Sequence, residues 1–184
     1  LGWKINGLLI KTDNMGNILW KRLYKDQQDR EKYEINITFV TELQNGDILT
    51  ASSLDTAQGN TSTNFMHDHT LLTRLTPGGN VLWSKTYNSV IEGDSQFMPF
   101  DVRSLAEAAN GDLILCGTAV NEFGSGMKEA IARIDNAGNK IWDGEYNAVS
   151  EGIRVFMDNG KVIVVGIEHN VSGSVPLAGS LHFM

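Results

Sequence analysis

TDNMGNILWKRLY, residues 12–24, carries a pattern that recurs twice more in the 184-residue chain. The related stretches are TPGGNVLWSKTY at 76–87 and DNAGNKIWDGEY at 135–146. In each stretch a glycine precedes a tryptophan by four residues and a tyrosine follows it by four, so the shared motif is [DT]-x-x-G-N-x-[LI]-W-x-x-x-Y. The tryptophans are 63 and 59 residues apart, and recurrence at such intervals indicates a repeat architecture.

Each copy of the motif predicts a β-hairpin. Apolar, β-prone residues flank a turn rich in Gly, Asn, Asp and Pro, which is the composition of a connection between two strands. On the second strand the Trp and the Tyr share one face, while Leu19, Leu82 and Ile141 lie on the other. Large apolar groups on both faces predict a strand held between neighbouring sheets. The aromatic residues expected to hold these sheets together are Trp20, Trp83, Trp142, Tyr24, Tyr87 and Tyr146.

A second hairpin signal alternates with the first. Asn45-Gly46, Asn110-Gly111 and Asn159-Gly160 each lie between two β-prone runs. Asn-Gly favours a tight hairpin because both residues tolerate positive φ, so these turns should be shorter than those of the tryptophan motif. Lys161 follows the third pair, where Asp47 and Asp112 follow the first two.

The repeated segments resemble the blades of β-propellers found in secreted or cell-surface proteins of Bacteroidetes. The resemblance is carried by LLIKTDNMGNILWKRLY, LLTRLTPGGNVLWSKTY and AIARIDNAGNKIWDGEY, together with NGDILTAS and NGDLILCGT. A looser similarity is to propellers of the quinoprotein type. The resemblance implies a fold of four-stranded antiparallel blades, and it implies no particular activity, because propellers include enzymes, binding proteins and scaffolds.

We therefore predict an all-β chain that forms a portion of a β-propeller with about three blade equivalents. The predicted units of the single portion 1–184 are a half blade at 7–24, blades at 35–88 and 101–147, and a half blade at 152–184. Propellers usually close with about four to eight blades. The interpretations left open are a portion of a longer propeller, a ring closed by two copies, and another stack of β-hairpins.

Composition excludes several classes of function. Fifteen basic and 22 acidic residues give a net charge of −7 without a basic stripe, which disfavours nucleic-acid binding. The single cysteine, Cys116, excludes an intrachain disulfide and sits in an apolar run that predicts a buried thiol. No apolar run reaches the roughly 20 residues of a membrane span, and residues 1–9 do not resemble a signal peptide.

The sequence offers only weak candidates for metal ligands. His67 and His69 would share one face of a strand, but no third ligand is evident, so no metal and no other cofactor is predicted. The turns at Asp13 and Asp135 resemble pieces of calcium loops but lack the alternating carboxylates and the terminal Glu. We interpret these two aspartates as side-chain caps on their turns.

No catalytic residues are predicted. The chain has no Gly-x-Ser-x-Gly motif. Glu92 and Asp94 are an acidic pair of the kind that a glycosidase uses, but a charged surface loop is the favoured interpretation. The alternative of a carbohydrate-active or quinone-dependent enzyme, acting at the rim or central axis of a propeller, is retained.

Recognition by propellers generally uses loops at one end of the ring. The longest insertions between the predicted strands are residues 53–69, 88–101 and 119–128. Their apolar residues suit contact with a protein or glycan partner, and packing beneath the loops as a minor core is the alternative interpretation. These candidate binding residues are Phe65, Met66, Phe97, Met98 and Phe123. The resulting expectation is a non-catalytic binding or scaffolding protein, extracellular or at the outer-membrane surface, such as a lipoprotein accessory to an outer-membrane complex.

Overall fold

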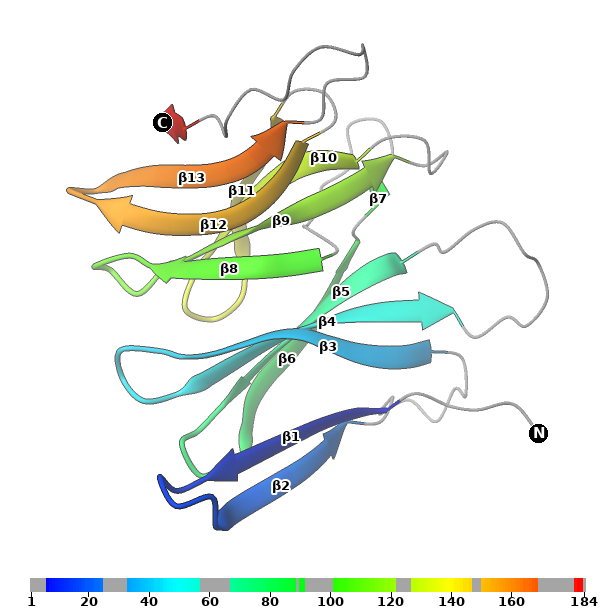
Figure 1. The fold of residues 1–184 in the computed structure, drawn as a ribbon, viewed down its shortest axis with the longest axis vertical. Helices are drawn as coiled ribbons and strands as arrows, with labels where there is room; N and C mark the ends of the chain where they lie inside the picture. Colours follow the sequence, from blue (N-terminus) through cyan, green and yellow to red (C-terminus); the bar gives the residue numbers. More distant parts are fainter. Residues whose placement is uncertain are drawn as a thin grey trace.

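The computed structural model describes residues 6–24, 33–56, 67–88, 90–91, 101–121, 127–146, 150–168 and 181–183. These residues form fourteen strands and no helix (Figure 1). The predicted all-β class is therefore confirmed for this part of the chain. Accordingly, no helix among the described residues is long and apolar enough to cross a membrane.

The strands form four sheets. Sheet I pairs β1 (Gly7–Thr12) with β2 (Ile18–Tyr24). Sheet II contains, in spatial order, β3 (Tyr33–Glu42), β4 (Ile48–Thr56), β5 (His67–Leu75) and β6 (Val81–Asn88). Sheet III contains β8 (Asp101–Glu107), β9 (Leu113–Asn121), β10 (Met127–Ile134) and β11 (Lys140–Tyr146), with β7 (Val90–Ile91) beside β9. Sheet IV contains β12 (Ser150–Asp158), β13 (Lys161–Glu168) and β14 (Leu181–Phe183).

Consecutive sheets pack against one another, and they follow the chain from sheet I to sheet IV (Figure 1). All strand pairs are antiparallel except β7 with β9, where Val90 lies opposite Val120. The strand β7 was not expected, because residues 88–101 were interpreted as an insertion. It extends sheet III with residues that directly follow sheet II in the sequence.

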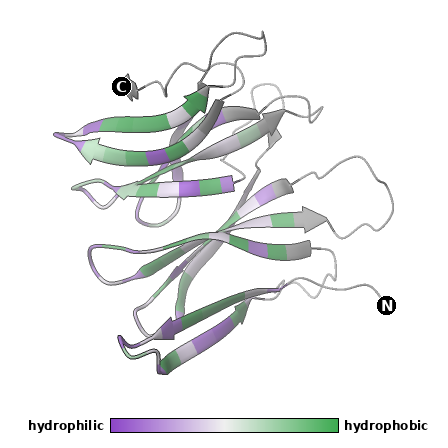
Figure 2. Cartoon of the chain, viewed as in Figure 1, coloured by the Kyte–Doolittle hydropathy of each residue, from purple (hydrophilic) through white to green (hydrophobic). Residues whose placement is uncertain are grey.

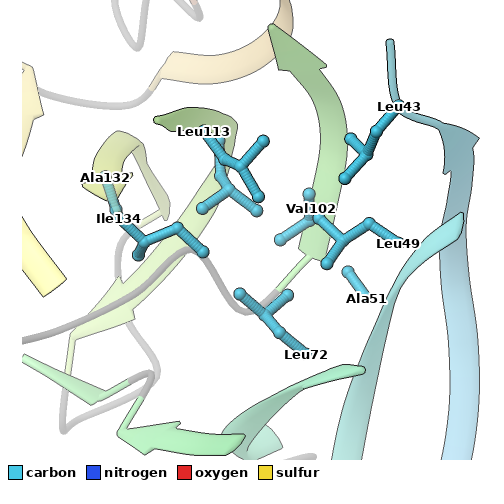
Figure 3. Close-up of a cluster of buried hydrophobic side chains, with 9 residues drawn as sticks. Leu43, Leu49, Ala51, Leu72, Val102, Leu113, Ala132 and Ile134 are labelled. Atoms are coloured by element: carbon cyan, nitrogen blue, oxygen red, sulfur yellow. The ribbon is translucent and has the colours of Figure 1, made fainter. Parts of the chain in front are cut away.

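Sheets II and III share a buried core (Figure 3). Sheet II contributes Leu49, Ala51 and Leu72, which are fully buried. Facing them are the sheet III residues Val102, Leu113, Leu115, Ala132 and Ile134. Since burying one leucine side chain contributes about 1.5–3 kcal/mol, this contact is a major source of stability.

A second core joins sheets III and IV. Ile114 and Cys116 point from β9 toward Val155 and Val164, whereas Leu113 and Leu115 point to the other core. The β9 sequence is apolar at successive positions because both of its faces are covered. Other strands, such as β1 and β13, are also largely hydrophobic along their length (Figure 2).

The predicted burial of Cys116 is confirmed. Burial, and to a smaller extent the Glu129 carboxylate, raise the pKa of the Cys116 thiol to about 12. The thiol is therefore protonated near neutral pH, which makes it a poor nucleophile.

The expected difference in length between the two kinds of turn is wrong. In the turns 13–17 and 43–47 alike, the first residue accepts a hydrogen bond from the glycine amide and donates one to the carbonyl of the fifth residue. The turns 76–80, 108–112 and 135–139 have the same bonds. All five are therefore five-residue connections with a glycine at positive φ.

Only Asn159-Gly160 forms the expected two-residue turn, with φ values of 49° and 79°. The difference lies in the residue after the glycine. The Asn45 side chain accepts a hydrogen bond from the Asp47 amide and donates one to its carboxylate, and Asn110 does the same with Asp112. Lys161 offers no carboxylate at the corresponding position.

The prediction that the Trp-containing strands are covered on both faces is also wrong. Leu19, Leu82 and Ile141 are 60%, 51% and 49% exposed. Each of these strands lies at an edge of its sheet, and Leu19, Leu82 and Ile141 point away from the face that carries the tryptophan. Exposed leucines at single positions are common on protein surfaces.

Two ion pairs connect the turns to the strand beside them. The Arg74 guanidinium lies 2.8 Å from the Asp47 carboxylate, and Arg133 lies 2.6 Å from Asp112. The Arg74 side chain is only 7% exposed, whereas that of Arg133 is 33% exposed. The two ion pairs therefore have the same geometry, but the Arg74 side chain is buried and the Arg133 side chain is partly exposed to solvent.

Removal of the two carboxylates should have unequal effects on stability. Asp47→Ala leaves a buried cation without its carboxylate, so we expect a loss of about 3 kcal/mol in the free energy of unfolding. Asp112→Ala should cost about 1 kcal/mol, because water can solvate Arg133. Urea denaturation measures both losses, with Glu42→Ala as an exposed control that changes little. Equal losses at the two aspartates would contradict this assignment.

Candidate binding surface and the joints that position it

Trp20 joins sheet I to sheet II. Its indole ring covers the turn 76–80, and its Nε1 donates a hydrogen bond to the Pro77 carbonyl at 3.1 Å. Arg22 donates from Nε to the Gly79 carbonyl at 2.9 Å, and its guanidinium lies 6.0 Å from the centre of the Trp20 ring. The tryptophan and the arginine therefore hold one turn of the next sheet by its backbone.

Trp83 joins sheet II to sheet III in the same way. Its ring covers the turn 135–139, and its Nε1 donates to the Asn136 carbonyl at 3.1 Å. Arg74 donates to the same carbonyl at 3.1 Å. Lys85 reaches the Asn139 side chain at 2.7 Å, in the position where Arg22 serves the first joint. Repetition of the joint explains the spacing of the motif.

Tyr87 completes the second joint. Its hydroxyl donates a short hydrogen bond to the Gly138 carbonyl. Burial, with a smaller contribution from the Asp135 carboxylate, raises the pKa of Tyr87 above its usual range. The hydroxyl therefore remains a donor at any physiological pH.

The other predicted aromatic residues occupy different surroundings. Trp142 packs against the core between sheets III and IV. Tyr24 is half-buried on β2, and burial raises the pKa of its hydroxyl. Tyr146 lies at the end of β11, and its side chain is outside the described part of the structure.

Substitution of Trp83 tests the joint. Trp83→Ala removes a half-buried ring and a hydrogen bond to the next sheet, so we expect a loss of about 2–3 kcal/mol. Trp83→Phe keeps most of the apolar contact and should lose about 1 kcal/mol. The neighbouring Leu82→Ala, on the exposed face, is the matched control and should change stability by less than about 0.5 kcal/mol. A Trp83→Ala loss no larger than that of the control would contradict the role of the joint.

The capping role predicted for Asp13 and Asp135 is confirmed by their hydrogen bonds. The Asp13 carboxylate accepts from the backbone amides of Met15 and Asn17 and from the Asn17 side chain. Asp135 accepts from Ala137 and Asn139 in the same pattern. These carboxylate oxygens are occupied within the turn, so the calcium-loop resemblance has no further support.

These hydrogen bonds lower both carboxyl pKa values below the ordinary 3.8. The largest cause of the lowered pKa is the hydrogen bond from the Asn17 side chain for Asp13, and the hydrogen bond from the Asn139 backbone amide for Asp135. A lowered pKa in the folded state means that the turns gain stability above the ordinary carboxyl pKa. That gain is lost as the pH falls through the lowered value.

An NMR titration should show this behaviour. The amides of Asn17 and Asn139 should shift with midpoints below pH 3.8. The Asn80 amide is the internal control, because it bonds the Thr76 hydroxyl at 3.1 Å and has no carboxylate to follow. Midpoints at or above 3.8 would contradict the capping geometry.

The structure bears only partly on the histidine candidates. His67 and His69 lie in β5 opposite Asp55 and Leu54, with a register shift that leaves Asp68 as an extra residue. This bulge interrupts the strict alternation from which a shared face was inferred. Among the described residues, no group of three or more His, Cys, Asp or Glu side chains is placed to hold a metal ion.

The remaining candidate residues lie outside the described ranges. These are Phe65, Met66, Phe97, Met98 and Phe123, as well as the acidic residues Glu92 and Asp94. Strand topology nevertheless indicates where their segments begin and end. The six short turns lie at one end of the sheets, so the described strand ends that flank residues 57–66, 92–100 and 122–126 lie at the opposite end (Figure 1).

Several residues that hold the joints were missed from the sequence. Arg22, Lys85 and Arg74 all supply donors to a turn of the next sheet. A signal was present, because a basic residue recurs shortly before each tryptophan turn at Lys11, Arg74 and Arg133. Its partner was not evident, because the contacts connect residues more than 50 positions apart.

Comparison with known proteins assigns no family to the chain. No protein-family profile matches the chain, and no curated protein matches it. Among solved structures, it is similar to a protein of unknown function from Bacteroides caccae, with 13% sequence identity and a TM-score of 0.48. The similarity covers 93% of this chain and 53% of the other, so the chain spans about half of that protein's length.

Proposed function

We propose that sheets I to IV are consecutive blades of a larger β-propeller, with sheet I as a half blade. Sheets II and III support this proposal, because each contains a four-stranded antiparallel meander in sequence order. The Trp20 and Trp83 joints support it further, because each connects one sheet to the equivalent turn of the next. Sheet IV, with its inner hairpin and β14, fits the start of a following blade.

We further propose that this propeller binds or scaffolds a protein or glycan partner at a bacterial cell surface. The observation that supports this proposal is that the polar side chains named here, among the described residues, stabilise the framework itself. The buried Arg74 and Asp47 form an ion pair, the turn carboxylates cap their own turns, and Cys116 is an inert thiol. A rigid framework of this kind suits presentation of the long connections at the opposite end.

The alternative function remains an enzyme that acts on carbohydrates or uses a quinone cofactor. Such an enzyme would need at least two carboxylates or a cofactor pocket facing a central axis. Glu92 and Asp94 are the acidic residues on which this alternative would rest.

Binding to envelopes isolated from Bacteroidetes cells tests the proposal. We expect labelled protein to bind saturably, and the loop variant Phe97→Ser/Met98→Ser to bind at least about tenfold more weakly because apolar contact residues are lost. Leu82→Ser is the matched control, since it changes an exposed apolar residue near the start of β6, beside the short turn 76–80, and it should bind normally.

Two results would contradict the proposal. One is equal binding by the loop variant and the unchanged protein. The other is turnover of a glycan panel that is abolished by Glu92→Gln, which would favour the enzyme alternative.

A further inference from the structure

The strand β1 has the same place in its sheet as β5 and β10. Each of these strands directly precedes a tryptophan strand and pairs with it. On the opposite edge, β5 pairs with β4 and β10 pairs with β9. Within the described residues, β1 pairs with β2 alone, so its other edge presents unpaired backbone groups.

The cationic residue Lys11 on β1 has a direct counterpart, Arg74, in sheet II. Lys11 lies opposite Trp20, as Arg74 lies opposite Trp83. Arg74 contacts two groups. One is the Asp47 carboxylate of its own sheet, at 2.8 Å, and the other is the Asn136 carbonyl of the next sheet. Among the described residues, the ion pair of Lys11 is directed toward the next sheet, to Glu42 of sheet II at 3.9 Å. A carboxylate beside β1 would complete the pattern.

Apolar exposure at β1 points to the same missing neighbour. Leu8 and Ile10 are 53% and 46% exposed. The residues at the position of Ile10 in sheets II and III, Thr73 and Ala132, are 2% and 0% exposed. Ala132 packs against sheet II, so Ile10 lies on the face of sheet I that is turned away from sheet II. A further strand beside β1, or a sheet packed on this face, would reduce this exposure.

We propose that the free edge of β1 binds a β-hairpin from outside residues 1–184, in antiparallel register, with a carboxylate after its turn that pairs with Lys11. By equivalence with β4, the residue two positions after that carboxylate lies opposite Lys11, as Leu49 lies opposite Arg74. This is strand addition, in which backbone hydrogen bonds give affinity and side chains give specificity. The inference concerns one sheet edge and does not depend on ring closure or on the function of the loops.

A second copy of this chain is a poor occupant. Its hairpin β12–β13 is the only described one outside sheets I to III, and Lys161 follows its turn where a carboxylate is needed. Lys161 beside Lys11 would place like charges together. The edge of β13 that would pair with β1 is already occupied by β14 at residues 163–165.

A peptide of residues 33–56, which contains the β3–β4 hairpin and Asp47, is the probe. We expect it to bind the whole protein in a calorimetric titration and to protect the β1 amides from hydrogen exchange. An Asp47→Lys peptide should bind about five- to tenfold more weakly, because an attraction becomes a repulsion. The protein variant Lys11→Glu should reverse this preference. Lys21→Glu, a control on β2, should leave it unchanged.

Each other outcome overturns the proposal. Equal affinity for the two peptides, or no reversal in Lys11→Glu with an unchanged circular dichroism spectrum, removes the charge-paired register. Protection, without peptide, of the β1 amides that point away from β2 shows that the edge is already covered. A dimer at micromolar concentration that excludes the peptide makes a second copy the occupant.

Discussion

The contact between an indole ring and a glycine turn is the constraint on which the order of the sheets depends. A Cβ atom on Gly79 would lie 3.0 Å from the Trp20 ring, and one on Gly138 would lie 3.1 Å from Trp83. Both glycines also have positive φ, so a side chain there would be strained as well as obstructed. The glycine lets the ring reach the backbone, and the indole nitrogen then bonds a carbonyl within the same turn.

The hairpins and the order of the strands were predictable because turn chemistry is local. Glycine at the fourth position of a five-residue connection identified where the chain reverses, and alternation of apolar residues identified the strands. The conformation of the Asn-Gly turns was not predictable from the pair alone. It depends on Asp47 and Asp112, whose side chains are held by arginines that arrive from a later strand.

Burial was predictable where a strand is apolar at successive positions, and less so at sheet edges. The apolar run around Cys116 in β9 indicated that this thiol is buried, and Leu115 and Cys116 are buried in different cores. Leu19 and Leu82 have similar apolar neighbours but lie on edge strands, where exposure is decided by which face meets the next sheet. The candidate loop residues and His67 depend on contacts beyond local pattern, so their roles stay predictions.

Because the Trp20 and Trp83 joints each connect one ring to a turn of the next sheet, cohesion between sheets I, II and III is a property of neighbours. Such proteins behave approximately as a one-dimensional array, in which stability is the sum of units and of the interfaces between them. Gene duplication can then lengthen the array by one unit without redesign of the others, provided that each new unit carries both the ring and the glycine. The same locality means that mechanical force applied at one terminus would detach the units in succession.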